Sequence, residues 1–201
     1  MIVTSPSGVL SQQMLQCSPE TLAAAAAGDR AAVDAMVLAW GPTVLRWCAR
    51  LGGPGVDAED AAHDSLVRIL GKLHTLKDPA AFPAWLFQTC RSVISRHRRH
   101  AWVRRWAGPV SRETPDPRDR FVESDLASAV QAALDALPSD LREVLVLCDV
   151  EGRCDPEAAA LLGIPVGTAK SRLRRARDLF GVEATARGLA PPLLAVVGEE
   201  P

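Results

Sequence analysis

The order of apolar and polar residues along the chain predicts helices in its first half. In residues 57–73, Ala62, Leu66, Ile69 and Leu73 follow the period of a helix and share one face. Ser18 and the residues Asp29 and Asp57 are suited to cap helix starts, and glycine clusters follow the apolar runs. Gly41-Pro42 is expected to interrupt or kink the chain. The predicted helices cover residues 18–28, 29–40, 43–51, 57–73 and 84–106.

A second group of helices follows a segment without core residues. Residues 107–123 contain three prolines, mixed charges and few apolar side chains, which is typical of a flexible linker. Beyond it, helices are predicted over residues 124–137, 141–150, 155–162 and 166–180. The fold class is therefore all-α, with two small helical domains at 18–106 and 124–181. We expect the tail, 182–201, to be poorly ordered or to bind something.

Composition excludes several classes of protein. Hydrophobic residues make up 48% of the chain and tyrosine is absent, but no apolar run reaches the roughly 18 residues of a membrane span. The first residues lack the features of a secretion signal, so we expect a cytoplasmic protein. The five cysteines and four histidines show no metal-ligand spacing, and the usual catalytic motifs are missing. We expect no enzyme activity, no metal and no cofactor.

Basic residues are concentrated in two segments, although the net charge is only −1. Residues 91–112 contain seven arginines and no acidic residue, and residues 165–177 contain five basic residues and no acidic one. Residues 113–164, between them, carry 12 acidic and 4 basic side chains. This distribution favours a protein that contacts nucleic acid at two places. The alternative is two solvated helix faces.

Residues 152–177 have the pattern of a helix-turn-helix. Gly163 can adopt the left-handed conformation that a tight turn between two helices requires. After it, apolar residues recur at i, i+4, i+7 and i+11, which predicts a single buried stripe. A basic opposite side is typical of a recognition helix in the major groove of DNA, although a basic surface helix remains the alternative. The stripe is Ala169, Leu173, Ala176 and Phe180, and the opposite side presents Lys170, Ser171, Arg174, Arg175 and Arg177.

Together these segments resemble the sigma-70 family of RNA polymerase sigma factors, in its extracytoplasmic-function (ECF) group. In the C-terminal half the resemblance lies in Leu137-Pro138, in residues 141–147, in Gly152 and in residues 162–168 and 170–173. It implies the family's fourth conserved region, which binds the −35 promoter element. The residues that the resemblance assigns to this contact are Thr168, Lys170, Ser171, Arg172, Arg174 and Arg175.

The N-terminal half resembles the family's second conserved region. The resemblance implies that the 57–73 helix docks on the clamp helices of the polymerase β′ subunit through Asp57, Asp60, His63, Asp64 and Arg68. It also implies that a flipped-out base of the −10 element is captured near the start of the 84–106 helix. The residues assigned to the −10 element are Phe82, Trp85, Arg91, Ser92, Arg96 and Arg99.

Some positions depart from the family pattern. Ser92 stands where the family usually has Asn in the base-binding pocket, and Arg96 stands where it often has Asp or Asn. His63 replaces a common Gln, and Cys154 occupies a helix-capping position that is usually Ser. These departures leave the −10 preference open. Trp102 and Trp106 can stack on bases or serve helix packing.

The function that this resemblance implies is that of a promoter-specificity subunit. Such a subunit binds core polymerase through the β′ clamp helices and the β flap, recognises the −35 and −10 elements and promotes DNA melting. An anti-sigma factor is a further partner that the resemblance allows. One alternative is a helix-turn-helix regulator that acts without polymerase, and another is a protein-interaction module that no longer binds DNA. The 57–73 helix and the Trp85 segment favour the first function, since a simple regulator needs neither.

Overall fold

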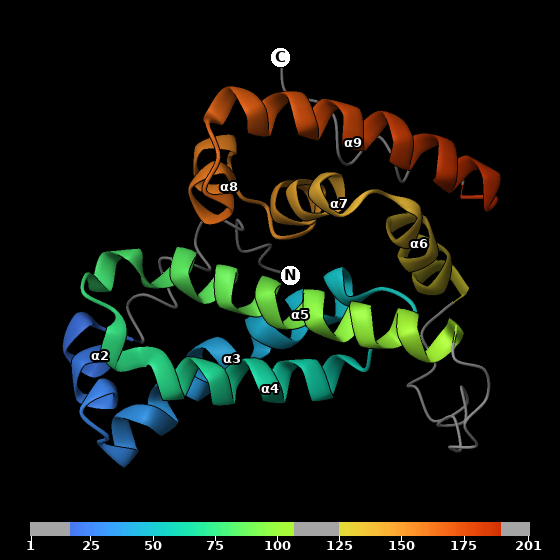
Figure 1. The fold of residues 1–201 in the computed structure, drawn as a ribbon. Helices are drawn as coiled ribbons and strands as arrows, with labels where there is room; N and C mark the ends of the chain where they lie inside the picture. The colour runs from blue at the N-terminus through green and yellow to red at the C-terminus, as the bar shows by residue number, and fades with distance from the viewer. Residues whose placement is uncertain (1–16, 107–124, 190–201) are drawn as a thin grey trace, which may run out of the picture.

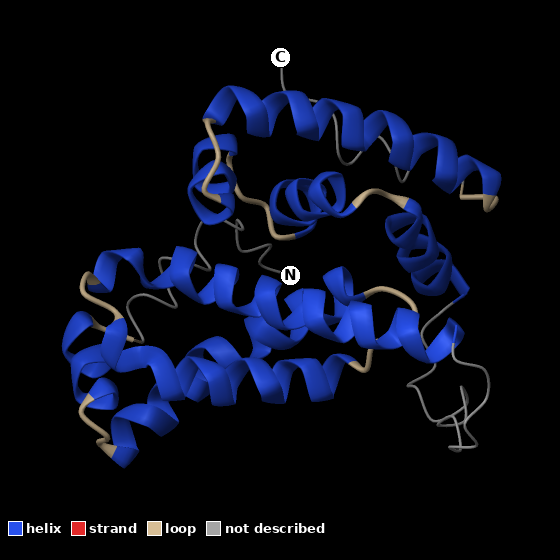
Figure 2. Ribbon diagram, viewed as in Figure 1, coloured by secondary structure: helices blue, strands red, loops and turns tan. Residues whose placement is uncertain are grey.

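The computed structural model describes residues 17–106 and 125–189. Every regular element in these two ranges is helical, with no strand among them (Figure 2). The helices form two layers, one from each half of the sequence, that lie against each other (Figure 1). The all-α class is therefore confirmed. The predicted linker (107–123) and the end of the predicted tail (190–201) lie outside the described residues.

The first layer contains four helices, and the first three begin directly after the predicted capping residues. They are α2 (Pro19–Ala26), α3 (Arg30–Gly52), α4 (Ala58–Lys72) and α5 (Phe82–Trp106). The side chain of Ser18 accepts a hydrogen bond from the backbone N–H of Thr21, and Asp29 and Asp57 cap the next two helices in the same way. Two short 3₁₀ turns, η1 (Leu73–Thr75) and η2 (Pro79–Ala81), connect α4 to α5.

Of the two outcomes predicted at Gly41-Pro42, an interruption or a kink, the interruption is wrong, because α3 runs without a break from Arg30 to Gly52. A proline inside a helix removes one hydrogen bond to the carbonyl four residues earlier, here that of Leu38. The Leu38 side chain is exposed, so this turn lies on the solvent side of the helix. Trp40 and Val44, on either side of the proline, are buried, and their packing holds the helix together.

Aromatic side chains form the centre of the first layer. Trp40 meets Phe82 edge to face with ring centroids 5.5 Å apart, and Trp47 meets Phe87 in the same manner at 5.0 Å. Edge-to-face pairs of this kind stabilise a core beyond the apolar area that they bury. Because Phe82 belongs to this core, α5 begins two residues earlier than its predicted start.

The second layer contains the helix-turn-helix. Its helices are α6 (Asp125–Ala136), α7 (Ser139–Leu145), which continues into a π-helical turn η4 (Val146–Val150), then α8 (Asp155–Leu162) and α9 (Val166–Ala186). Gly163 joins the last two with φ 67° and ψ 36°, the predicted left-handed conformation. α9 lies on the outer side of this layer, away from α5 (Figure 1).

The last helix extends six residues beyond its predicted end at Phe180. Ala184 and Leu189 are buried with Ala133 of α6 in a small separate cluster. This packing stabilises the helical turns after Gly181, which the sequence did not predict. Residues 182–189, which we assigned to the tail, are thus part of the folded layer.

Three cysteines are unreactive in this fold. Burial raises the pKa of the Cys48 thiol to about 11 and those of Cys90 and Cys148 to about 12. The nucleophilic thiolate is therefore scarce at neutral pH. Among the described helices, none is long and apolar enough to cross a membrane.

Candidate nucleic-acid interface

The helix α9 separates a buried stripe from a cationic face. Ala169, Leu173 and Ala176 are buried as predicted, with Phe180 partly buried beside them. On the other side, the cationic face of α9 consists of the exposed side chains Lys170, Ser171, Arg174 and Arg175. Its three cations form no ion pair with any residue that the structure describes. They are available to an external anion.

Two other arginines of α9 are bound within the protein. Arg177 donates two hydrogen bonds to the carboxylate of Asp149, at 2.8 and 3.1 Å, and this contact raises its pKa further. Arg172, which we predicted to contact DNA, lies 3.5 Å from Asp140 of α7. Thr168 is half-buried, and its carbonyl accepts a hydrogen bond from the hydroxyl of Ser171. These residues orient the helix within its own layer.

The residues predicted to contact the −10 element are spread along α5 in different environments. Ser92 and Arg99 are exposed, and Trp85 is half-buried. Phe82 is fully buried against Trp40 and has a packing role, because no part of its ring reaches the surface. Arg91 and Arg96 are both engaged in ion pairs.

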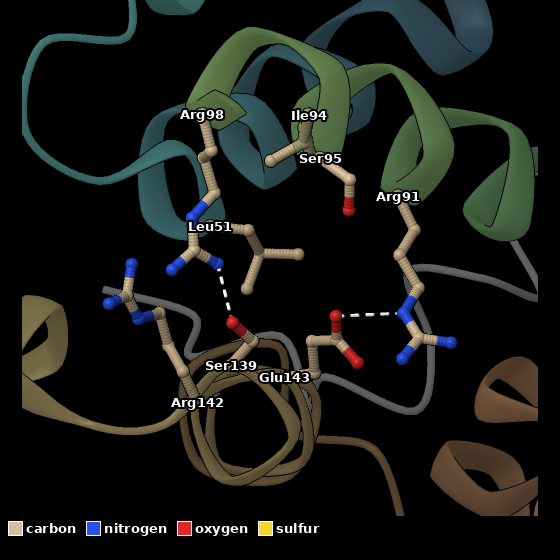
Figure 3. A pocket seen from close by; sticks show the side chains of 8 residues that line it. All are labelled: Leu51, Arg91, Ile94, Ser95, Arg98, Ser139, Arg142 and Glu143. Carbon is tan, nitrogen blue, oxygen red and sulfur yellow. Dashed lines mark hydrogen bonds and ion pairs between the residues drawn. The ribbon is translucent and has the colours of Figure 1, made fainter. Parts of the chain in front are cut away.

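Side chains of α5 bridge the two layers (Figure 3). Arg91 donates to the Glu143 carboxylate at 2.8 Å, and Arg98 donates to the Ser139 hydroxyl at 2.7 Å. At the start of α5, the Gln88 amide donates to the carbonyl oxygen of Leu161 at 2.7 Å. We call this set of contacts the layer interface. It places part of α5 against α7 and α8.

Helix α3 adds two further contacts to the layer interface. Arg46 pairs with Glu151 at 3.1 Å, and Arg50 donates to the side chain of Gln131 at 3.2 Å. These polar contacts surround an apolar one, because a single cluster of buried hydrophobic residues contains side chains of both layers. The layer interface therefore combines apolar packing with hydrogen bonds and ion pairs.

The carboxylate of Glu143 occupies a small polar pocket between the layers (Figure 3). Its Oε1 atom accepts from Arg91, whereas Oε2 is buried without a hydrogen-bond partner among the described residues. Burial raises the pKa of Glu143, and the charge of Arg91 partly opposes this shift. The pair is therefore only partly satisfied.

Two arginines of the second layer are almost completely buried and differ in their partners. Arg142, 1% exposed, donates to the side chain and carbonyl of Asp135 and to the carbonyl of Leu137. Arg153 is 3% exposed, and none of its three guanidinium nitrogens has a hydrogen-bond partner within the part of the chain that the structure describes. Burial lowers the pKa of Arg153, and the charges of Glu151 and Glu157 only partly oppose this shift. Burial of Arg153 in this arrangement is therefore costly.

The predicted docking helix α4 offers a smaller free surface than its sequence suggests. Asp60 and His63 are exposed, and Arg68 is half-buried. Asp57 caps the helix, because its carboxylate accepts from the backbone N–H groups of Glu59 and Asp60. The capping role occupies one oxygen of Asp57.

The remaining predicted docking residue, Asp64, contacts α5. Its carboxylate lies 2.8 Å from Arg96 and 2.8 Å from His97, and the hydrogen bond with His97 is the main cause of its lowered pKa. Residues that we assigned to polymerase and to the −10 element therefore bind each other here.

The acidic partners of Arg91, Arg172 and Arg177 were not identified from the sequence. Glu143, Asp149 and Asp140 all lie in the acidic stretch between the two basic segments. That charge distribution was a signal for intramolecular pairing, but it does not indicate which acid meets which arginine.

Comparison with known protein families agrees with this division into two parts. The family model of sigma-70 region 2 matches residues 36–104, and that of sigma-70 region 4 matches residues 127–179. The fold and the cationic helix-turn-helix thus define a two-region sigma factor, the kind of subunit that binds core RNA polymerase and promoter DNA.

Curated relatives narrow this class. The chain is 35% identical over 162 residues to the ECF RNA polymerase sigma factor SigE of Mycolicibacterium smegmatis, covering 76% of this chain and 63% of that one. It is 33% identical over 164 residues to the ECF sigma factor SigC of Mycobacterium tuberculosis, covering 80% and 87%. The chain belongs to the ECF group of the sigma-70 family.

Two solved structures share its architecture. The sigma factor CnrH, in complex with the cytosolic domain of CnrY, superposes with a TM-score of 0.63 at 26% identity, covering 83% of this chain and 96% of that one. RpoE from Bartonella quintana, in complex with the anti-sigma factor NepR, gives a TM-score of 0.55 at 26% identity, covering 74% and 94%.

Proposed function

We propose that this protein is a promoter-specificity subunit that recognises a −35 element through α9 and a −10 element through α5, and promotes melting of the DNA. The observation that carries this proposal is the cationic face of α9, presented by a helix-turn-helix with a buried stripe behind it. Arginine and lysine on such a face can donate to guanine edges or hold phosphates. Its cytoplasmic location follows from this role.

Recognition of both elements requires the layer interface to open. Elements named −35 and −10 are separated by about 25 base pairs, or about 85 Å of duplex. Helix α9 is only about 32 Å long, and α8 alone separates its start from α5. The closed arrangement therefore represents a state before promoter binding, in which Arg91 is held by Glu143 and not by DNA.

In this proposal α4 docks on the β′ clamp helices and the second layer reaches the β flap. Asp60 and His63 provide the exposed polar surface of α4, and the exposed Val67 lies one turn further on. An anti-sigma factor is a second partner, by analogy with the complex of RpoE and NepR. Such a partner can act by keeping the two layers together.

Run-off transcription tests the proposed function directly. The purified chain is added to core polymerase and a promoter pool, and the transcript starts are sequenced. We expect defined start sites that share −35 and −10 sequences and that disappear when the chain is omitted. Sequence-specific DNA binding without any transcript would instead identify a regulator that acts without polymerase.

Docking through α4 is tested separately. Asp60→Arg should weaken co-purification with core polymerase, because it places a cation where an exposed acid meets the proposed basic partner surface. Asp34→Arg on the exposed side of α3 is the matched control, since it makes the same charge change on another helix. Equal retention of both variants by core polymerase would contradict the docking assignment.

A further inference from the structure

The loop after α3 contains two glycines that face different neighbours. Gly53 and Gly55 both have φ 78°, in the left-handed region. At Gly53 ψ is −176°, and this combination of angles is adopted essentially by glycine alone. A side chain at either position would strain the backbone. The two positions differ in what such a side chain would meet.

Gly55 faces the first layer. A Cβ atom at this position would lie 3.5 Å from Cβ of Ala101 and 3.9 Å from Nη2 of Arg105, which are ordinary contact distances to α5. The carbonyl oxygen of Gly55 accepts a hydrogen bond from Arg104, also in α5, at 3.1 Å. These neighbours stay in place whether or not the two layers are in contact.

Gly53 faces the second layer. A Cβ atom there would lie 3.1 Å from Nη1 of Arg142 in α7 and 3.8 Å from Oδ1 of Asp135 in α6. The first distance is shorter than the roughly 3.5–4.0 Å at which non-bonded heavy atoms pack. Arg142 thus approaches the backbone of Gly53 so closely that a side chain does not fit between them.

The guanidinium of Arg142 is held in this position. It is 1% exposed, and it donates to Oδ1 and the carbonyl oxygen of Asp135 at 3.1 and 2.7 Å and to the carbonyl oxygen of Leu137 at 3.3 Å. The same carboxylate accepts from the amide of Gln131, which also donates to the carbonyl oxygen of Arg50 in the last turn of α3. A cation beside the C-terminal end of a helix is favourable, because the helix dipole places partial negative charge there.

We propose that Arg142 and Gly53 form a latch that holds the two layers together, and that position 53 must be glycine for the latch to close. Leu51 and Arg98 of the first layer line the same pocket as Arg142 (Figure 3). Separation of the layers exposes the guanidinium to water and removes its contact with Gly53. This inference rests on the proposed function, because it names the residues that control the closed state before promoter binding.

The latch differs in kind from the neighbouring ion pair. Arg91 can exchange the carboxylate of Glu143 for a phosphate, because one anion replaces another. Gly53 presents only backbone to Arg142, so DNA offers no equivalent exchange at this point. Opening of the layers therefore requires loss of the latch, and a single added methyl group is enough to test it.

The test compares Gly53→Ala with Gly55→Ala in the full-length chain. Both variants add a methyl group at φ 78° in the same loop, so both should lower the melting temperature. Only Gly53→Ala meets the second layer. It should raise the ratio of open to closed chain by about fivefold or more, seen as a larger radius of gyration in small-angle X-ray scattering. Gly55→Ala should keep the wild-type radius, and equal radii for the two variants would overturn the inference.

Arg142→Lys tests the latch from the other side. It keeps the cation but removes the planar guanidinium, so it should also increase the radius. Adding Gly53→Ala to this variant should change the radius little further, because the atom that the methyl group meets is gone. Simple addition of the two effects would mean that the residues do not act on each other. An unchanged radius in Arg142→Lys would contradict the latch even if Gly53→Ala failed to fold.

Binding to DNA separates this inference from the proposed function. The opened Gly53→Ala chain releases Arg91 and Arg98 from the second layer. It should therefore bind a labelled single-stranded −10 oligonucleotide about fivefold more tightly than Gly55→Ala, measured by fluorescence anisotropy. A larger radius without tighter binding would support the latch and count against the −10 assignment of the proposed function. Tighter binding without a larger radius would count against the latch.

Discussion

The two basic helices, α9 and α5, use their cations differently. The cations of the α9 face, Lys170, Arg174 and Arg175, project from the surface without ion-pair partners in the described part of the chain. On α5, Arg91 and Arg96 are paired with Glu143 and Asp64. Similar basic sequences thus produce one helix that is free to bind DNA and another whose cations are largely committed within the protein.

This difference suggests an order of events. The closed chain presents the cationic face of α9 to solvent, whereas Arg91 and Arg98 of α5 are released only when the layers separate. Arg96 stays paired with Asp64 within its own layer. An ion pair between the layers can be exchanged for a contact with phosphate at little net cost, because one charged partner replaces another. In the proposed function, the layer interface therefore keeps Arg91 occupied until the layers separate.

The largest expected effect comes from removing the free cations of α9. Lys170→Ala combined with Arg174→Ala and Arg175→Ala should lower the affinity for a −35 duplex by about 100-fold or more at low salt, and should reduce the salt slope by about 2–3. Arg174→Ala alone should cost about 1–3 kcal/mol if that residue contacts a base. The measurement is anisotropy of a labelled duplex across a salt series.

The control for this prediction is a triple variant of α5. Replacing Arg96, Arg99 and Arg105 with alanine removes the same charge but should change binding of the free chain to a −35 duplex only slightly. Equal losses in the two variants would show that the free chain does not distinguish its two basic helices.

Replacement of the buried Arg153 should have the next largest effect. Arg153→Met should stabilise the protein by about 1–3 kcal/mol, because it removes a buried guanidinium that makes no hydrogen bond to any described residue. For a chain of this length the melting temperature should rise by about 2–4 °C per kcal/mol. The matched control is Arg142→Met, which breaks three hydrogen bonds, leaves Asp135 without its cation and should lower the melting temperature. A decrease in both variants would mean that Arg153 is stabilised by contacts other than hydrogen bonds.

A smaller effect is expected from the ion pair at the layer interface. Glu143→Gln should leave the closed arrangement at least as stable as in the wild type, because it removes a buried charge whose desolvation outweighs the attraction of Arg91. Small-angle X-ray scattering should show an equal or smaller radius of gyration, and binding of single-stranded −10 DNA should not increase. Glu59→Gln on α4 makes the same charge change at an exposed position and should alter neither quantity. A larger radius for Glu143→Gln would show that the ion pair with Arg91 stabilises the closed form more than burial of the Glu143 charge destabilises it.

The smallest effect concerns pH. Because burial raises the pKa of Glu143, the closed form takes up a proton more readily than an open form in which this residue is hydrated. The resulting stabilisation is complete below the ordinary pKa of 4.5 and is lost as pH rises through the raised value. Moderate acidification should therefore favour closure through this residue. The contribution of Asp64 to stability depends on pH in the opposite direction. Because the pKa of Asp64 is lowered, its contribution is lost only when the pH falls through that lowered value.

Scattering between pH 7 and pH 4.5 tests the sign of this dependence. The wild-type radius of gyration should stay constant or decrease, and the Glu143→Gln variant should show a weaker dependence. Opening of the wild type over this range, absent in the variant, would mean that the Arg91 charge dominates the titration of Glu143.

Local sequence signals were sufficient for most helix boundaries. Ser18, Asp29 and Asp57 cap the helices that they were predicted to start, and Gly163 adopts the predicted left-handed turn. Caps and turns depend on residues a few positions apart, so the sequence alone determines them. The orientation of α9 followed from the same kind of information, because the period of its apolar residues defines the face opposite Ala169, Leu173 and Ala176.

Tertiary structure decided which polar residues are free. Arg91 and Glu143 are 52 positions apart, and Arg177 and Asp149 are 28 apart, so no local pattern indicates that they meet. Phe82 and Trp40, 42 positions apart, likewise join one core only when α3 and α5 pack together. Ion pairs and core contacts depend on how helices distant in sequence are brought together, whereas a helix start depends on its nearest neighbours. The sequence by itself therefore determined the helices and the family of this protein, and the packing of the two layers determined which of its cations remain available to DNA.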